Sequence, residues 1–144
     1  MKKIIVSACL LGENCKYNGG NNYSQAVADY VRDKIVIPVC PEVAGGLLTP
    51  RPSAEIVNGV VKIADGTSVD KEFRTGAKIV IEQIQRELAE GNEIECAILQ
   101  SRSPSCGVHR IYDGTFSGKL IKGQGVFAEE LSKMGIKLID KEQL

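Results

Sequence analysis

The chain has 144 residues, of which 43% are hydrophobic and 25% are charged. This length and composition are typical of one globular domain and exclude an intrinsically disordered chain. The 18 basic and 18 acidic side chains balance to a formal net charge of zero, whereas a protein that wraps a long stretch of nucleic acid usually carries a basic excess. The charge balance therefore disfavours nucleic acid as a partner, without excluding a local basic patch.

The N-terminal segment does not resemble a targeting sequence. The apolar run at residues 4–6 is too short for a signal peptide, and residues 7–11 lack a typical cleavage context. No stretch approaches the length of a membrane span. We therefore expect a cytoplasmic protein with no membrane partner. In that reducing compartment five cysteines indicate metal binding, catalysis or core packing rather than a disulfide framework.

The first half of the chain predicts a strand, a helix, a second strand and a hairpin. Residues 3–8 are a continuous apolar, β-branched run, typical of a strand buried on both faces. Apolar and aromatic residues at helical spacing predict a short helix over 23–31. Residues 35–40 predict another buried strand, although Pro38 argues against a long, fully paired one. An Asn-Gly pair between β-type segments predicts a hairpin over 55–63.

The second half continues the alternation. An apolar stripe predicts the longest helix over 71–90, with a glycine at its C-terminal end. Residues 96–99 predict a third buried strand. An Asp-Gly pair at 113–114 indicates a second hairpin. A last helix is expected over 124–134, followed by a strand at 136–139.

Short apolar strands that alternate with helices predict an α/β fold. We expect one domain over residues 1–144, with a mainly parallel, Rossmann-like sheet, helices on both faces and a small β-hairpin excursion. In such sheets ligands bind beyond the carboxyl ends of the strands. Cys9 ends the first predicted strand, Cys40 ends the second, and Cys106 lies in the loop after the third. These three thiols should therefore meet at one edge of the sheet.

The five cysteines divide by their surroundings. Cys9, Cys40 and Cys106 lie in or beside loops rich in Gly, Pro and Ser, whose backbone N–H groups can approach a thiolate or sulfide. Cys96 lies within an apolar strand, which predicts core packing. For Cys15, loop or core packing is favoured over a role as a spare ligand. No CxxC pair is present, so spacing alone leaves a metal centre and three ordinary turns as equal alternatives.

Three short signatures follow one another along the chain. They are Ser-Ala-Cys-Leu-Leu-Gly at 7–12, Cys-Pro-Glu-Val-Ala-Gly-Gly-Leu at 40–47 and Ser-Pro-Ser-Cys-Gly at 103–107. Further matching pieces are Lys-Tyr-Asn-Gly at 16–19, Ile-Tyr-Asp-Gly at 111–114 and Gly-Gln-Gly-Val-Phe at 123–127. With this ordered set, which covers nearly the whole chain, the sequence resembles the thiouracil desulfurase (TudS) family.

The resemblance implies a cofactor and an activity. Members of that family carry a [4Fe-4S] cluster on three cysteines, and the matching positions are Cys9, Cys40 and Cys106. The fourth iron has no protein ligand. The family removes sulfur from thiolated pyrimidines and gives the oxygenated base and sulfide. We therefore expect a desulfurase for a small-molecule substrate, a 2-thiouracil-like base or nucleoside.

The resemblance also implies catalytic residues. The acid/base residue of the family is the glutamate of the Cys-Pro-Glu motif, which is Glu42 here, and a serine before the third cysteine assists it. Ser103 is the expected serine and Ser101 the reserve. Two positions depart from the family pattern: Asn18 stands where aspartate is common, and Gln100 where lysine is common. A contact between either residue and the substrate would change specificity or activity.

The expected chemistry suits these residues. Three ligands leave one iron of the cluster able to bind something else, as in catalytic metal sites. A thiocarbonyl sulfur is a soft ligand for iron, and coordination would polarise the C=S bond. Water must then attack the carbon while Glu42 takes its proton, a contribution typically worth about 10²–10⁴-fold in rate. The reaction is a non-redox hydrolysis, because no external electron is required.

Other interpretations of the same residues stay open at this stage. Without the family resemblance, Glu42 would be interpreted as a carboxylate at the start of a helix. Ser103 and Ser105 would be interpreted as residues that cap the turn beside Pro104. The spacing from Cys106 to His109 could complete a Cys₃His zinc site in a structural or binding module.

Two further alternatives concern Cys15. An electron-transfer protein would need a fourth cluster ligand, for which Cys15 is the candidate, and thiol–disulfide chemistry could link Cys9 and Cys15. Near the expected site, Arg51, Arg102 and Arg110 are either exposed surface charges or a balance for an anionic cluster.

Overall fold

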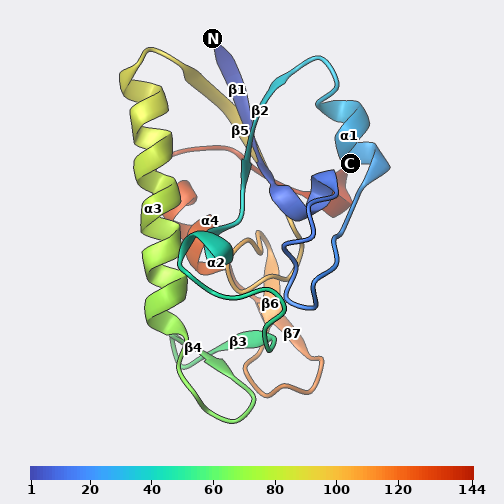
Figure 1. Cartoon of the computed structure of the whole chain (residues 1–144), viewed down its shortest axis with the longest axis vertical. Coiled ribbons are helices and arrows are strands. Elements are labelled where there is room, and N and C mark those ends of the chain that lie inside the picture. Colours follow the sequence, from blue (N-terminus) through green and yellow to red (C-terminus); the bar gives the residue numbers. More distant parts are fainter.

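The central sheet of the computed structural model, which describes all 144 residues, has four strands. They are β1 (Lys2–Ser7), β2 (Ile35–Val39), β5 (Glu93–Leu99) and β8 (Leu138–Asp140), in the order β2-β1-β5-β8. Every neighbouring pair is parallel, which confirms the predicted sheet. Since parallel strands share one direction, all four carboxyl ends lie at the same edge, which points toward the two hairpins in Figure 1.

Helices cover both faces of this sheet (Figure 1). Helices α3 (Asp70–Ala89) and α4 (Val126–Lys133) pack on one face, where they share a hydrophobic core with Ile5, Ala97 and Leu99. Helix α1 (Gln25–Tyr30) and the 3₁₀ turn η1 (Ala8–Leu11) contribute to a second core on the other face. The alternation of side chains along a strand explains why one apolar run supplies two cores. The predicted α/β architecture is therefore confirmed.

The short helix α2 (Pro41–Ala44) packs directly against α3 through two glycines. A Cβ atom on Gly45 would lie 2.0 Å from the carbonyl oxygen of Glu72, and one on Gly76 would lie 1.8 Å from the carbonyl oxygen of Pro41. Only the missing side chains allow the two backbones to approach so closely. This contact fixes the turn that carries Cys40 and Glu42 against the longest helix.

Two hairpins lie beyond the carboxyl edge of the sheet. The first joins β3 (Ala54–Val57) to β4 (Val60–Ile63) through Asn58 and Gly59, both at positive φ, as the Asn-Gly signal predicts. The second joins β6 (Arg110–Tyr112) to β7 (Leu120–Lys122) through a loop longer than the predicted Asp-Gly turn.

The hairpins are tied together by Glu55. Its Oε1 atom accepts hydrogen bonds from the backbone N–H groups of Gly114 (3.0 Å) and Phe116 (3.1 Å). Phe116 is one of three non-glycine residues at positive φ. A carboxylate from the first hairpin therefore holds the loop of the second hairpin in place.

Some predicted boundaries and burial patterns are corrected. Helix α1 begins at Gln25 because Ser24 caps it and accepts a hydrogen bond from the N–H of Val27. Tyr23 and Tyr30, expected in its apolar stripe, are exposed, whereas Val27 is fully buried. A helix of six residues presents only a narrow face to the sheet, so few of its side chains reach the core.

The chain ends with the 3₁₀ turn η2 (Lys141–Gln143). None of the helices combines the length and the hydrophobicity that crossing a bilayer requires.

Candidate metal centre and active site

A cavity of about 620 Å³ opens at the carboxyl edge of the sheet. The ends of β1, β2 and β5 form its inner wall, and residues of both hairpins, among them Glu55, Tyr112 and Phe116, form part of its rim. This volume lies in the range of about 300–1,000 Å³ that is usual for small-molecule sites. The cavity therefore lies at the edge of the sheet where the site is expected.

Cys9, Cys40 and Cys106 all line this cavity. Cys9 lies in η1, directly after β1, and Cys40 is the N-cap of α2, directly after β2. Strands β1 and β2 are neighbours in the sheet, and Ser7 at the end of β1 lies opposite Val39 at the end of β2. Cys9 and Cys40 therefore follow two adjacent strand ends. Cys106 comes from the loop that follows β5, on the other side of β1.

Polar side chains approach these sulfur atoms. The side-chain amide of Asn22 donates to Cys9 Sγ at 3.6 Å, and the hydroxyl oxygen of Ser105 lies 3.7 Å from Cys106 Sγ. Burial nevertheless raises the pKa of Cys9, and it raises the pKa of Cys106 to about 12. Without a cation both groups are therefore neutral thiols at pH 7, and a metal centre would supply the positive charge that a thiolate needs.

The two remaining cysteines differ from each other. Cys96 is buried in the core beneath α1, which confirms its predicted packing role. Cys15 is a fourth thiol in the cavity wall, where burial and the neighbouring Cys40 raise its pKa to about 12. The sequence predicted ordinary packing for Cys15 and not a position in the cavity wall. Cys15 reaches the wall because the loop between η1 and α1 folds back over the end of β2.

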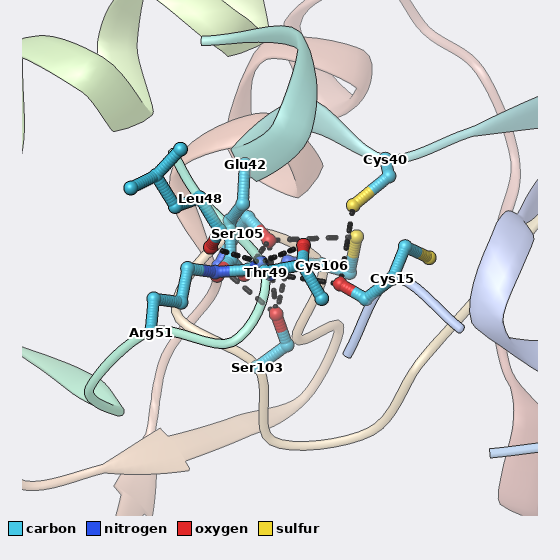
Figure 2. A network of polar contacts seen from close by, with 9 residues as sticks. All are labelled: Cys15, Cys40, Glu42, Leu48, Thr49, Arg51, Ser103, Ser105 and Cys106. Atoms are coloured by element: carbon cyan, nitrogen blue, oxygen red, sulfur yellow. Dashed lines mark hydrogen bonds and ion pairs between the residues drawn. The ribbon is translucent and has the colours of Figure 1, made fainter. Parts of the chain in front are cut away.

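The carboxylate of Glu42 lies in the same cavity and belongs to a polar network (Figure 2). Its Oε2 atom accepts a hydrogen bond from Ser105 at 2.9 Å. Ser103, the expected assistant, contacts Ser105 at 3.0 Å between the hydroxyl oxygens and accepts hydrogen bonds from the N–H groups of Ser105 (3.1 Å) and Cys106 (3.0 Å). The structure therefore places Ser105, and not Ser103, directly on Glu42.

Ser101, the reserve, lines the cavity but donates its hydroxyl to Asp140 at 2.5 Å. The signal that could have identified Ser105 is its position next to Cys106, which carries its side chain to the ligand side of the turn.

The three arginines near the site have different environments. Arg51 is nearly buried, with 7% of its side chain exposed, and forms an ion pair with Glu42 at 3.1 Å. Arg102 is half exposed and pairs with Glu142 at 3.1 Å, and Arg110 is exposed. The expectation of exposed surface charge therefore holds for two of them and is wrong for Arg51.

The Cys₃His zinc alternative does not fit the structure. His109 is exposed, contacts Gln143 Oε1 at 3.0 Å and does not line the cavity. Nowhere do three His, Cys, Asp or Glu side chains come close enough together to bind a single metal ion. Three soft thiol donors around a wide cavity suit a larger iron–sulfur group, whose ligands stand further apart than those of one ion.

The two departures from the family pattern lie in different places. Asn18 is exposed, accepts a hydrogen bond from the N–H of Gly20 and does not line the cavity. Gln100 does line it, and its Oε1 atom is buried without a hydrogen-bond partner. Only Gln100 is therefore placed to influence what the cavity binds.

Comparison with known proteins agrees with this geometry. Residues 4–143 match the family model for 2-thiouracil desulfurase. The uncharacterized protein YbbK of Bacillus subtilis (strain 168) is 39% identical over 146 residues, which covers 98% of this chain and 97% of that protein. The solved structure of a [4Fe-4S]-dependent thiouracil desulfidase, TudS (DUF523Vcz), is 40% identical with a TM-score of 0.88, covering 100% of this chain and 93% of that one. The chain therefore belongs to the 2-thiouracil desulfurase family.

Proposed function

We propose that this chain is an iron–sulfur-dependent desulfurase that removes sulfur from a thiolated pyrimidine, a 2-thiouracil-like base or nucleoside, and gives the oxygenated base and sulfide. The observation that carries the proposal is one cavity lined by Cys9, Cys40 and Cys106 together with the carboxylate of Glu42. The 40% identity to a [4Fe-4S]-dependent thiouracil desulfidase supports it.

Cys9, Cys40 and Cys106 would hold the [4Fe-4S] cluster. When bound, the cluster supplies a Lewis acid for the soft thiocarbonyl sulfur. The side-chain N–H of Asn22, which already points at Cys9 Sγ, would stabilise that thiolate, and the polar side chain of Ser105 lies beside the sulfur of Cys106. The cavity walls orient the flat substrate beside the thiols.

Glu42 is the group that takes the proton of the attacking water. Its Oε2 atom faces Ser105, so the hydroxyl can keep that oxygen directed into the site or pass a proton to it. Ser103 supports the same arrangement one hydrogen bond further away, because it holds both Ser105 and the backbone of Cys106. The reaction is a hydrolysis, with water as the only co-substrate.

The test begins with protein purified without oxygen. We expect about four irons and four acid-labile sulfides per chain, the composition of a [4Fe-4S] cluster, and release of uracil and sulfide from 2-thiouracil. The substitution Cys106→Ser should abolish both. Cys96→Ser is the matched control, because Cys96 is a buried cysteine outside the cavity. A wild-type protein that holds the cluster but releases no sulfide from a thiolated base or nucleoside would contradict the proposal.

Two properties of the whole chain belong to this proposal. All five cysteines are unpaired, which supports a reducing compartment and hence a cytoplasmic enzyme. Residues 1–144 act as one domain, because both hydrophobic cores pack on the same sheet.

A further inference from the structure

Arg51 joins three segments of the cavity wall (Figure 2). Its Nη1 atom donates to the carbonyl oxygen of Leu48 (3.1 Å) and to Thr49 Oγ1 (3.0 Å), and its Nη2 atom donates to the carbonyl oxygen of Cys15 (2.9 Å). Its backbone N–H donates to the carbonyl oxygen of Tyr17 at 2.7 Å. The guanidinium is therefore held by neutral acceptors on two loops before its contact with Glu42 is considered.

The remaining contact is with the carboxylate. Nε of Arg51 donates to Oε1 of Glu42 at 3.1 Å, while Oε2 of Glu42 accepts from Ser105 at 2.9 Å. Each carboxylate oxygen thus has its own partner. Exposure of the two side chains is only 7% for Arg51 and 17% for Glu42, so water competes weakly for these positions. The two contacts together fix the orientation of the Glu42 carboxylate relative to Ser105.

Lysine could not make this set of contacts. A guanidinium is planar and rigid, with five N–H groups in fixed directions, whereas an ammonium is a compact charge on a flexible stem. Arg51 uses its side-chain nitrogens for contacts with four acceptor atoms. Its charge alone is therefore not sufficient, because the direction of Nε–H follows from the anchoring of the other two nitrogens.

We propose that Arg51 is a positioning residue for the desulfuration: it holds Oε1 of Glu42 and thereby keeps Oε2 on Ser105 and toward the reacting water. This inference rests on the proposed function, because it assigns Glu42 the role of the base. The side-chain nitrogens of Arg51 all bind protein acceptors, so Arg51 acts on the rate through Glu42.

The test is a double-mutant cycle with Arg51→Lys and Glu42→Gln, measured on cluster-loaded enzyme with a thiolated pyrimidine. Arg51→Lys should lower kcat by about 100-fold, the cost of misplacing a catalytic group by about 1 Å, while KM and the iron and sulfide content stay unchanged. In the Glu42→Gln background the same substitution should change kcat by about twofold or less, because residues that act as a unit are not additive.

Arg74→Lys is the matched control. Arg74 also bridges a carboxylate (Asp70, 3.3 Å) and a backbone carbonyl (Gly59, 3.0 Å), but it does not line the cavity. This variant should retain wild-type kcat. Equal losses from Arg51→Lys in both backgrounds would overturn the proposal, and so would loss of the cluster from Arg51→Lys, which would make Arg51 a residue of cluster retention.

A second readout does not depend on activity. In a crystal structure of cluster-loaded Arg51→Lys, we expect Glu42 Oε2 to have left hydrogen-bonding distance of Ser105. A carboxylate that stays in place would overturn the positioning role, even if the enzyme were slow. If the wild-type enzyme instead released no sulfide from any thiolated pyrimidine, the proposed function would fail. The crystal structure of the Arg51→Lys variant would still decide whether Arg51 orients Glu42.

Discussion

At the scale of single residues, the two serines of the Ser-Pro-Ser-Cys turn have separate tasks. Ser103 accepts hydrogen bonds from two backbone N–H groups and so shapes the turn, whereas the hydroxyl of Ser105 contacts the Glu42 carboxylate and the Cys106 sulfur. A serine that caps a turn contributes to stability, and a serine on the proposed base is expected to contribute to catalysis. The two side chains can therefore be distinguished by substitution.

We expect Ser105→Ala to lower kcat by at least about 10-fold, because it removes the hydroxyl group that contacts Glu42, the proposed general base. We expect Ser103→Ala to lower the free energy of unfolding by about 1–2 kcal/mol, because two N–H groups lose their acceptor. Steady-state kinetics and urea unfolding of both variants check this. Equal decreases in kcat with unchanged stability in the two variants would contradict these separate roles of Ser103 and Ser105.

Burial of the Cys106 thiol predicts a pH dependence of the cluster-free chain. Desolvation raises its pKa from the ordinary 9.0 to about 12, so the folded chain holds this proton more tightly than the unfolded chain. The resulting stabilisation is fully present below pH 9 and is lost as the pH rises through about 12. Urea unfolding of the cluster-free protein from pH 8 to 11 should show this loss, and Cys106→Ala should show less of it. An identical alkaline dependence in both proteins would refute the assignment.

At the scale of elements, the contact between α2 and α3 positions the candidate ligand Cys40 and the proposed base Glu42. Gly45 and Gly76 lie where the two backbones meet, and neither position has space for a side chain. Helix propensity alone would favour alanine at Gly76 by about 1 kcal/mol. For Gly76→Ala, close packing therefore predicts a lower free energy of unfolding, whereas helix propensity predicts a higher one.

We expect packing to dominate, so that Gly76→Ala lowers the free energy of unfolding by about 1–3 kcal/mol, as overpacked cores do. It should also reduce cluster content, because α2 must move. Thr75→Ala, at an exposed position of the same helix, is the control and should change stability by less than about 0.5 kcal/mol. Chemical unfolding measures both, and a stabilised Gly76→Ala would show that the backbones have room to separate.

At the scale of the whole molecule, the three candidate ligands come from segments that are far apart in the sequence. Cys9 follows β1, Cys40 follows β2, and Cys106 lies in the loop after β5. A cofactor that binds all three therefore crosslinks the central part of the sheet in the folded state, and it has no equivalent site in the unfolded chain.

Removing the cluster should therefore lower Tm. Since roughly 2–4 °C corresponds to each kcal/mol in a domain of about this size, a decrease of at least about 5 °C is expected on removal by a chelator under oxidising conditions. Calorimetry of loaded and cluster-free protein checks this, with Cys106→Ser as a variant that should show no difference between the two treatments. An unchanged Tm in the wild type would mean that the cluster does not link these segments.

The sequence by itself determined the α/β class, the parallel sheet and the meeting of Cys9, Cys40 and Cys106 at one edge. These follow from the hydrophobic period of each strand and from the common direction of parallel strands, which are local and general properties. The Cys-Pro-Glu signature also identified Glu42 as a candidate site residue. Its position near Cys40 follows from the sequence, because only one residue separates the two.

Only the tertiary structure decided which polar side chains meet in the cavity. It placed Ser105 on Glu42, brought Cys15 and the buried Arg51 to the wall and directed His109 to the surface. These residues lie in irregular loops, where no repeating period predicts the direction of a side chain. Their positions depend instead on hydrogen bonds between segments distant in sequence, such as the one from Arg51 to the carbonyl oxygen of Cys15.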